Sequence, residues 1–241
     1  MLLDASRTAL AQGDHAQAVM LAEELLDEDP DDIEALLLVA DAAPRYGHGE
    51  VGALAAAQAA RRGADIGALE AAALLAACQV DRALDAADAA LGRNPNDARA
   101  YAVRGQALEL LGRIADGEAA LGRAAALRPA AYPLPLAVPA DAWESLLLAA
   151  RSGLDREHRD ALRGVALVFV DLPALDTLRG MVPPPSPLVD ALLIDPDARH
   201  PRLELYRRNL LRGAATLEDL ETRMRSALSS EADLLLGEDE A

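Results

Sequence analysis

Apolar residues follow one arrangement before about Pro129 and another after it. The first part consists of apolar helical segments joined by short glycine-containing stretches such as Gln12-Gly13-Asp14 and Leu111-Gly112-Arg113, which predict turns between paired helices. The later part contains the continuous apolar run Val165–Val170 and the alternating run Arg202–Tyr206, both typical of β-strands. We therefore expect a helical half followed by a mixed one.

The helical half contains an internal repeat. A small residue lies 12 positions before a proline in three segments: Ala18 and Pro30, Ala83 and Pro95, and Gly117 and Pro129. Pro95 and Pro129 are 34 positions apart, and Pro30 and Pro95 are 65 apart, so a weaker unit lies between them. Two helices can approach closely at a small residue, and a proline ends the second helix. Asp31-Asp32 and Asn96-Asp97 are suited to cap the next helix.

The 34-residue period resembles the tetratricopeptide family. The fourth unit matches its pattern at Tyr101, Gly105, Leu108, Ala124 and Pro129, and departs from it at Arg104. The first matches through Gly13, Ala18, Leu25 and Pro30, and the third through Ala83, Ala90 and Pro95. The second, about 33–64, is degenerate, with Gly52 at the small-residue place. The resemblance implies an α-solenoid whose concave face binds a protein or peptide partner.

Three residues of the fourth unit are candidates for partner binding: Arg99, Tyr101 and Arg104. The alternatives are that the arginines belong to a solvated face, and that the solenoid packs only against its own C-terminal domain.

The proline-rich stretch 130–140 predicts a semi-rigid linker, because proline interrupts regular helix. This divides the chain into repeats over 1–129 and a second domain over 141–241. Asp141 is expected to cap a helix through Trp143, and Thr216-Leu217-Glu218-Asp219 forms a capping box at the start of the last helix. With the two strands, this predicts a small α+β domain.

The second domain resembles the minimal zincin-like metallopeptidases of bacteria. The resemblance depends on Val168-Phe169-Val170-Asp171-Leu172-Pro173 and on Glu204-Leu205-Tyr206-Arg207-Arg208-Asn209-Leu210, the latter expected as a strand. In that family the final helix carries H-E-x-x-H, in which two histidines hold zinc and the glutamate acts as a base.

This sequence has lost that motif. Aligned on Gly237, the glutamate position holds Glu231, whereas the two histidine positions hold Ser230 and Leu234, and Glu240 stands near a third ligand position. Leucine cannot ligate a metal, so we expect no catalytic centre, no metal and no cofactor. The four histidines, His15, His48, His158 and His200, are expected to face solvent. A local cluster of arginines, made of Arg202, Arg207, Arg208 and Arg212, is expected to pair with Glu218, Asp219 and Glu221, and anion binding is the alternative.

Composition supports this interpretation. The formal net charge is −17 and every basic residue other than histidine is arginine, so nucleic acid and anionic membranes are unfavourable partners. The single cysteine, Cys78, is expected to be a buried apolar residue of a helix. No signal peptide or long apolar span is evident, so we expect a cytoplasmic protein.

The sequence thus predicts a non-catalytic adaptor in which the repeats bind a protein and a pseudo-peptidase domain adds a second surface. Two alternatives stay open: an active zinc peptidase with other ligands, and a structural subunit of a larger assembly. The oligomeric state does not follow from the sequence.

Overall fold

A computed structural model describes residues 1–196 and 198–238, apart from the side chain of Glu238. The chain forms two compact units, Met1–Tyr132 with Ala174–Pro187, and Pro133–Pro173 with Leu188–Ala241. Within the described residues, no helix is long and apolar enough to cross a membrane.

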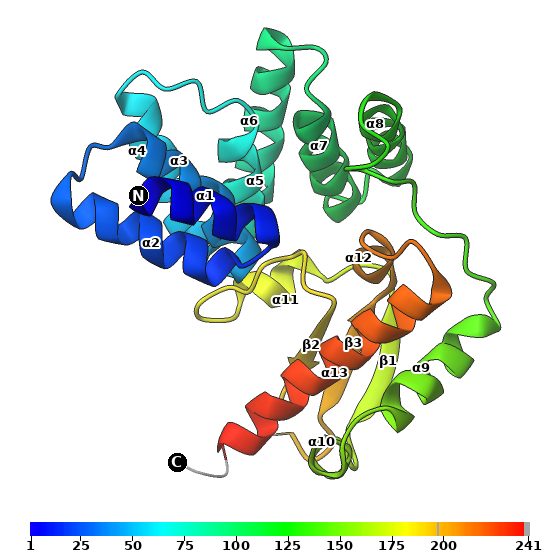
Figure 1. Cartoon of the computed structure of the whole chain (residues 1–241). Helices are drawn as coiled ribbons and strands as arrows, with labels where there is room; N and C mark the ends of the chain where they lie inside the picture. Colours follow the sequence, from blue (N-terminus) through cyan, green and yellow to red (C-terminus); the bar gives the residue numbers. More distant parts are fainter. Residues whose placement is uncertain (197, 239–241) are drawn as a thin grey trace. The chain divides into compact units, whose positions relative to one another are not determined.

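The first unit is a row of antiparallel helix pairs (Figure 1). In chain order the helices are α1 (Leu2–Gln12), α2 (His15–Glu28), α3 (Ile33–Ala42), the 3₁₀ helix η1 (Ala43–Tyr46), α4 (Gly49–Arg61), α5 (Leu69–Ala76), α6 (Val80–Arg93), α7 (Ala98–Leu110) and α8 (Ile114–Leu127). The short α11 (Leu175–Arg179) also belongs to this unit.

The turn inside each helix pair shows the repeat most clearly. A residue with positive φ stands there in all four pairs: Gly13, Gly47, Cys78 and Gly112. These positions are successively 34, 31 and 34 residues apart. The predicted tetratricopeptide-type array is therefore confirmed by the chain's own geometry, and the degenerate second unit is a complete helix pair.

The small residues of the repeat lie where two helices approach closely. Ala18 and Ala83 are completely buried. A Cβ added at Gly117 of α8 would lie 2.8 Å from the carbonyl oxygen of Gly105 in α7, closer than real Cβ contacts come. A Cβ at Gly52 would lie 2.6 Å from Pro44 Cγ. These contacts explain why no larger side chain occupies the repeated position.

Two predicted caps are present. The Asp32 carboxylate accepts hydrogen bonds from the backbone N–H groups of Glu34 and Ala35 at the start of α3. The Asp97 carboxylate accepts one from Ala100 N–H at the start of α7. Each satisfies donors that a helix N-terminus leaves without an intrahelical partner.

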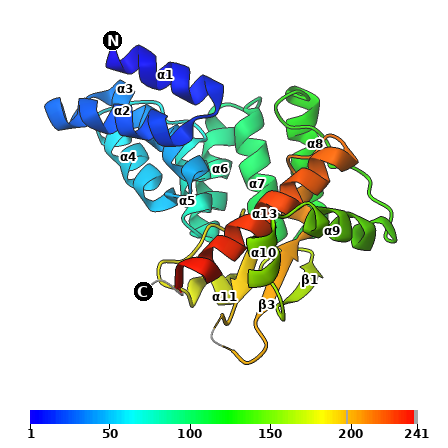
Figure 2. The same ribbon diagram turned by 60° about the horizontal axis from the view of Figure 1, so that its bottom comes forward.

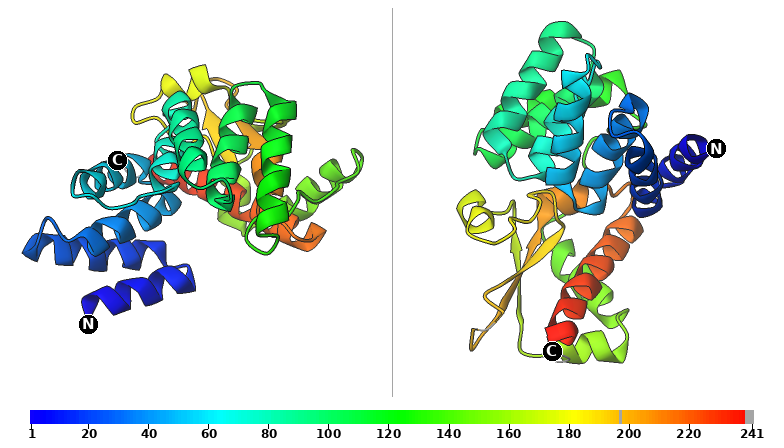
Figure 3. Two further views of the ribbon diagram at one scale, coloured as in Figure 1. Left: turned by 90° about the horizontal axis from the view of Figure 1, so that it is seen from above. Right: turned by 90° about the vertical axis from the view of Figure 1, so that its left-hand side faces the viewer.

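The second unit is an α+β arrangement, as predicted, built on a three-stranded sheet of order β1-β3-β2. β3 (Arg202–Tyr206) pairs parallel with β1 (Ala166–Val170) and antiparallel with β2 (Ala191–Ile194). Figure 2 and the right-hand view of Figure 3 show the long helix α13 running beside this sheet. The remaining helices are α9 (Ala142–Ser152), α10 (Arg156–Ala161), α12 (Arg207–Leu211) and α13 (Leu217–Glu238).

The core of the second unit joins the sheet to its helices. Leu203 and Leu205 of β3 and Leu220, Met224 and Leu228 of α13 are completely buried in one apolar cluster. The capping box at the start of α13 is present, since Asp219 N–H donates to Thr216 Oγ1 at 3.1 Å and Thr216 N–H donates to the Asp219 carboxylate at 3.0 Å.

Several predictions for this unit need correction. The strand expected over Glu204–Leu210 ends at Tyr206, and the chain then turns into α12. Strand β2 was not predicted. Asp141 stands at the N-cap of α9, but its side chain makes no capping hydrogen bond, because its backbone is already helical.

The segment Ala174–Pro187 is the main difference between the two compact units and the domains expected from the sequence. It lies between β1 and β2 along the chain but groups with the repeats. There the Arg179 guanidinium forms an ion pair with Asp81 of α6 at 3.2 Å. The proposed boundaries at 129 and 141 stay a prediction about independent domains.

Candidate partner-binding groove

The first helices of the four pairs together line one groove of about 390 Å³. We call it the inner groove; its lining residues are Arg7, Leu10, Glu34, Leu37, Leu38, Asp41, Leu69 and Arg99. They come from α1, α3, α5 and α7, so every repeat contributes. Four leucines give the groove an apolar surface that four charged side chains border.

The charged side chains of the inner groove form two ion pairs. Arg7 Nη2 lies 2.9 Å from Glu34 Oε2, and Arg99 Nη1 lies 3.0 Å from Asp41 Oδ1. Arg45 reaches the same Asp41 carboxylate at 3.3 Å. Both groove pairs join side chains from different helices, which fixes the polar groups along the groove.

The Asp41–Arg99 pair is the better shielded of the two, with side chains 23% and 31% exposed against 50% and 58% for Arg7 and Glu34. Burial alone would lower the pKa of the Arg99 guanidinium, but Asp41, with a smaller contribution from Tyr132, raises that pKa above its ordinary value. Arg99 is therefore a fixed cation across the physiological pH range, one that a partner's carboxylate could share with Asp41.

The three predicted binding residues do not lie on one surface. Arg99 lies in the inner groove, whereas Arg104 Nε donates to Asp88 Oδ1 of α6 at 2.7 Å. At about 100° per residue, Tyr101 and Arg104 lie on the far side of α7 from Arg99. Arg104 therefore links two helices of the array, and a direct binding role for Tyr101 and Arg104 stays a prediction.

The described positions that the sequence aligned with the peptidase motif, Ser230, Glu231, Leu234 and Gly237, lie on α13. Glu231 is 9% exposed, and its carboxylate accepts a hydrogen bond of 2.7 Å from the backbone N–H of Leu193 on β2. Burial raises the pKa of Glu231, and the Leu193 N–H lowers it by less. The Ser230 hydroxyl donates to the Ser226 carbonyl oxygen at 3.1 Å. Within the residues that the structure describes, Glu231 is thus a hydrogen-bond acceptor for the edge strand β2.

Leu234 is 57% exposed. Gly237 is exposed near the end of the described helix. Glu240 lies outside the described residues. No group of three or more histidine, cysteine or acidic side chains in the described parts of the chain is arranged to hold a metal ion.

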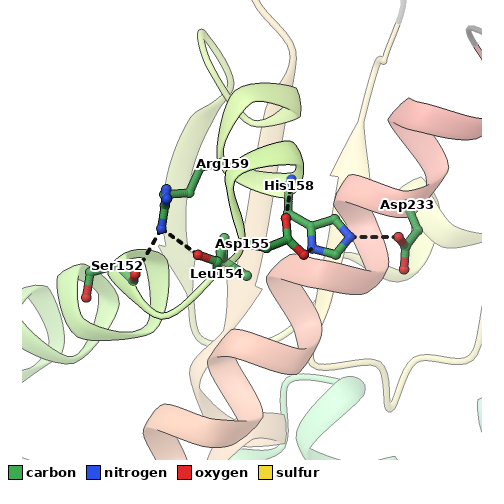
Figure 4. Close-up of polar contacts among 6 residues, drawn as sticks. All are labelled: Ser152, Leu154, Asp155, His158, Arg159 and Asp233. Atoms are coloured by element: carbon green, nitrogen blue, oxygen red, sulfur yellow. Dashed lines mark hydrogen bonds and ion pairs between the residues drawn. The ribbon is translucent and has the colours of Figure 1, made fainter.

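His158 is the histidine whose surroundings differ most from expectation. It was expected to face solvent, but its side chain is only 19% exposed. Figure 4 shows its ring between two carboxylates, with Nδ1 2.9 Å from Asp155 and Nε2 2.8 Å from Asp233. These contacts join α10 to α13, so the position of His158 is accounted for by a structural role.

Arg202 and Arg207 pair within the unit, but with acids other than those expected. Arg202 pairs with Glu204 at 2.9 Å, and Arg207 lies 3.4 Å from Asp171 while its guanidinium stacks over the Trp143 and Phe169 rings at 5.7 and 5.3 Å. Of the expected acids, Asp219 caps α13 and Glu221 lies 3.5 Å from Arg225.

The chain was compared with known proteins. No protein-family model and no curated protein sequence matches it. Among solved structures it is similar to the crystal structure of MamA, at 19% identity and a TM-score of 0.43, over 52% of this chain and 74% of that one. It is also similar to TTC0263, a thermophilic TPR protein in Thermus thermophilus, at 25% identity and a TM-score of 0.48, over 53% of this chain and 73% of that one. Because both TM-scores are below 0.5, the repeat assignment rests on the helix pairs and turn spacing described above.

Sequence reasoning singled out Arg99 but none of the other residues that line the inner groove. Asp41 and Arg99 are 58 positions apart, and nothing in either local segment indicates that they meet. The available signal was the period itself, because the first helices of successive repeats line a common face.

Proposed function

We propose that this protein is a non-catalytic adaptor whose inner groove binds an extended segment of a partner protein. The observation that supports the proposal best is the inner groove itself. Half-buried leucine side chains from three helices, Leu10, Leu37 and Leu69, line it together with two ordered ion pairs. Apolar area provides binding free energy, and fixed charges orient a bound segment.

The proposal extends to the second unit as a pseudo-peptidase that adds another surface. In support, the glutamate at the base position is bonded to the backbone of β2, and Leu234 at a ligand position has no atom that can bind zinc. A peptidase base has to reach a metal-bound water, whereas the Glu231 carboxylate already accepts a hydrogen bond inside the fold.

The adaptor function is tested by capture from the native host with the full chain. Leu37→Ser removes an apolar side chain of the inner groove, and Leu134→Ser removes a 66% exposed leucine outside it. Proteins captured by the wild type should be lost with Leu37→Ser and kept with Leu134→Ser, with folding checked by circular dichroism. Equal capture by both variants would show that the inner groove is not the binding surface.

The peptidase alternative is tested by elemental analysis of untagged protein purified without chelators. We expect zinc far below one ion per chain. Zinc close to one per chain would overturn the pseudo-peptidase interpretation. A structural subunit would differ from an adaptor by eluting from native lysate only as one stable complex of fixed size.

A further inference from the structure

A second groove, of about 760 Å³, lies between α2 and α4 in the first unit. We call it the α2–α4 groove. The side chains that characterise it are Asp14, Met20, Glu23, Tyr46, His48 and Val51. It is formed by the second helices of two repeats, whereas the inner groove is formed by first helices, so the two grooves share no residue.

The irregular second repeat gives this groove one of its walls. The 3₁₀ turn η1 extends α3 and contains Pro44, which lies against α4 where Gly52 has no side chain. Tyr46 is the last residue of η1, and the centre of its ring lies 4.9 Å from that of His48, with the two ring planes tilted by 56°. Both rings line the groove.

Large apolar side chains are exposed in this groove. Met20 is 59% exposed, Tyr46 53% and Val51 39%, and Leu54, one turn further along α4, is 71% exposed. Four exposed apolar residues on α2, η1 and α4 exceed the scattered single residues of an ordinary surface. Methionine adapts to varied apolar partners, and tyrosine combines an apolar ring with a polar end.

The charged side chains that line the groove have one sign. Asp14 and Glu23 line it, and no arginine does. The exposed surface of α2 continues beyond Glu23 with Glu24, Asp27 and Glu28. Asp14 is the N-cap of α2, where its carboxylate accepts from Gln17 N–H at 3.0 Å and stays in place. A partner that places apolar side chains on Met20 therefore meets the carboxylates of Asp14 and Glu23 before and after Met20 along α2.

From this combination we infer that the α2–α4 groove binds a basic amphipathic segment of another protein, with apolar residues on one face and Lys or Arg at its edges. The apolar face covers Met20, Tyr46 and Val51, and the flanking cations lie toward Asp14 and Glu23. A Lys or Arg of the segment that lies over the exposed ring of Tyr46 adds a cation–π interaction to the binding free energy. This is the arrangement by which an amphipathic helix binds in a groove.

A second copy of this chain is a poorer occupant. Each chain carries a formal net charge of −17, so two copies repel each other, and bringing acidic surfaces together opposes apolar contact. A basic segment is attracted by the same charge.

The test uses the full chain and a labelled synthetic helical peptide of leucine and lysine with one apolar face. A twin peptide carries glutamate in place of each lysine. Fluorescence anisotropy measures both, at low and at physiological salt. The lysine peptide should bind and the glutamate twin should not.

Variants separate the groove from the charge of the whole molecule. Met20→Ser with Val51→Ser should weaken binding of the lysine peptide about tenfold, the change that follows from losing about 1.4 kcal/mol of contact. Glu23→Gln with Asp14→Asn should weaken it and reduce its salt dependence, since Asn still caps α2. The matched controls Leu148→Ser and Glu144→Gln, both exposed on α9, should leave binding unchanged.

Three results would overturn the inference. Equal binding by the Met20→Ser/Val51→Ser variant and the wild type would mean that net charge alone attracts the peptide. Binding of the glutamate twin would show that Asp14 and Glu23 do not select a basic segment. If sedimentation showed a dimer of the wild type and a monomer of the Met20→Ser/Val51→Ser variant, the occupant of the groove would be a second copy of the chain. Leu37→Ser should not affect this binding, so its outcome is independent of the inner groove.

Discussion

The Nε2 atom of His158 lies 2.8 Å from a carboxylate oxygen of Asp233 on α13, while its Nδ1 faces Asp155 on the other side (Figure 4). A neutral imidazole has a single N–H and can donate to only one of these carboxylates. Both contacts are satisfied when the ring is protonated, so the arrangement favours imidazolium and joins α10 to α13 with charge-assisted hydrogen bonds.

We therefore expect stability to depend on pH through His158. Its pKa is raised, mainly by the hydrogen bond to Asp233. The folded protein then binds this proton more tightly than the unfolded chain, so the contribution to stability is complete below about pH 6.5, the unfolded pKa, and is lost as pH rises through the folded pKa. Thermal unfolding of wild type and His158→Asn across this interval should show the loss only in the wild type.

NMR titration of the imidazole checks the cause. Asp233→Asn should lower the pKa of His158, whereas Asp160→Asn should leave it almost unchanged, because Asp160 on the same short helix pairs with Arg156 and Arg163. An unaltered pKa in Asp233→Asn would show that the contact is absent in solution.

Two glycines of α8 should respond to alanine in opposite ways. A Cβ at Gly117 would lie 2.6 Å from Glu109 Cγ and 2.8 Å from the Gly105 carbonyl oxygen, while a Cβ at Gly122 meets nothing within 4 Å. Gly122→Ala should stabilise the protein by ~0.5–1 kcal/mol through helix propensity. Gly117→Ala should destabilise it by ~1–3 kcal/mol, because overpacking forces α7 and α8 apart. Urea unfolding measures both, and equal effects would contradict the close approach.

Cys78 tests backbone strain. It occupies the turn position that is glycine in the other three repeats, with φ of 58°, and it is 4% exposed. Cys78→Gly should be more stable than Cys78→Ala by ~1 kcal/mol, because an L-residue in this conformation costs about that much. In a helix the order would be reversed.

Burial raises the pKa of the Cys78 thiol, so labelling by a thiol reagent should be slow in the folded wild type.

Glu231 should behave as a structural acceptor. Because burial raises its folded pKa, the contribution of this group to stability falls as pH rises from its ordinary value of 4.5 through the folded one. Glu231→Gln keeps an acceptor for Leu193 N–H and removes the buried charge, so it should be at least as stable as the wild type at pH 7. Glu231→Leu should lose ~1–3 kcal/mol by leaving that N–H unpaired. The reverse order in chemical unfolding would argue for a charge required at this position.

Local sequence signals predicted much of the fold and little of the site. The turns at Gly13 and Gly112, the caps at Asp32 and Asp97 and the strand ending at Val170 each depend on a few neighbouring residues, so a single sequence is sufficient to predict them. Strand β2 is four apolar residues long, and such a run has no period that separates strand from helix.

Other features depend on residues far apart in the chain. The Asp41–Arg99 pair and the Glu231–Leu193 contact form only when the whole unit folds. Cys78 was correctly expected to be buried but was placed in a helix, because its alanine- and leucine-rich surroundings concealed a turn that only the spacing from Gly112 indicates.

The grouping of Ala174–Pro187 with the repeats determines when the first unit can be completed during synthesis. Synthesis delivers Met1–Tyr132 first, and helix pairs with local contacts fold early on the ribosome. The partner of Asp81, Arg179, emerges only after β1 has been translated and before β2 and β3. The nascent repeats therefore present the α6 surface without its final covering segment until the middle of the second unit has left the tunnel. A chain stopped at residue 132 would remain in that unfinished state.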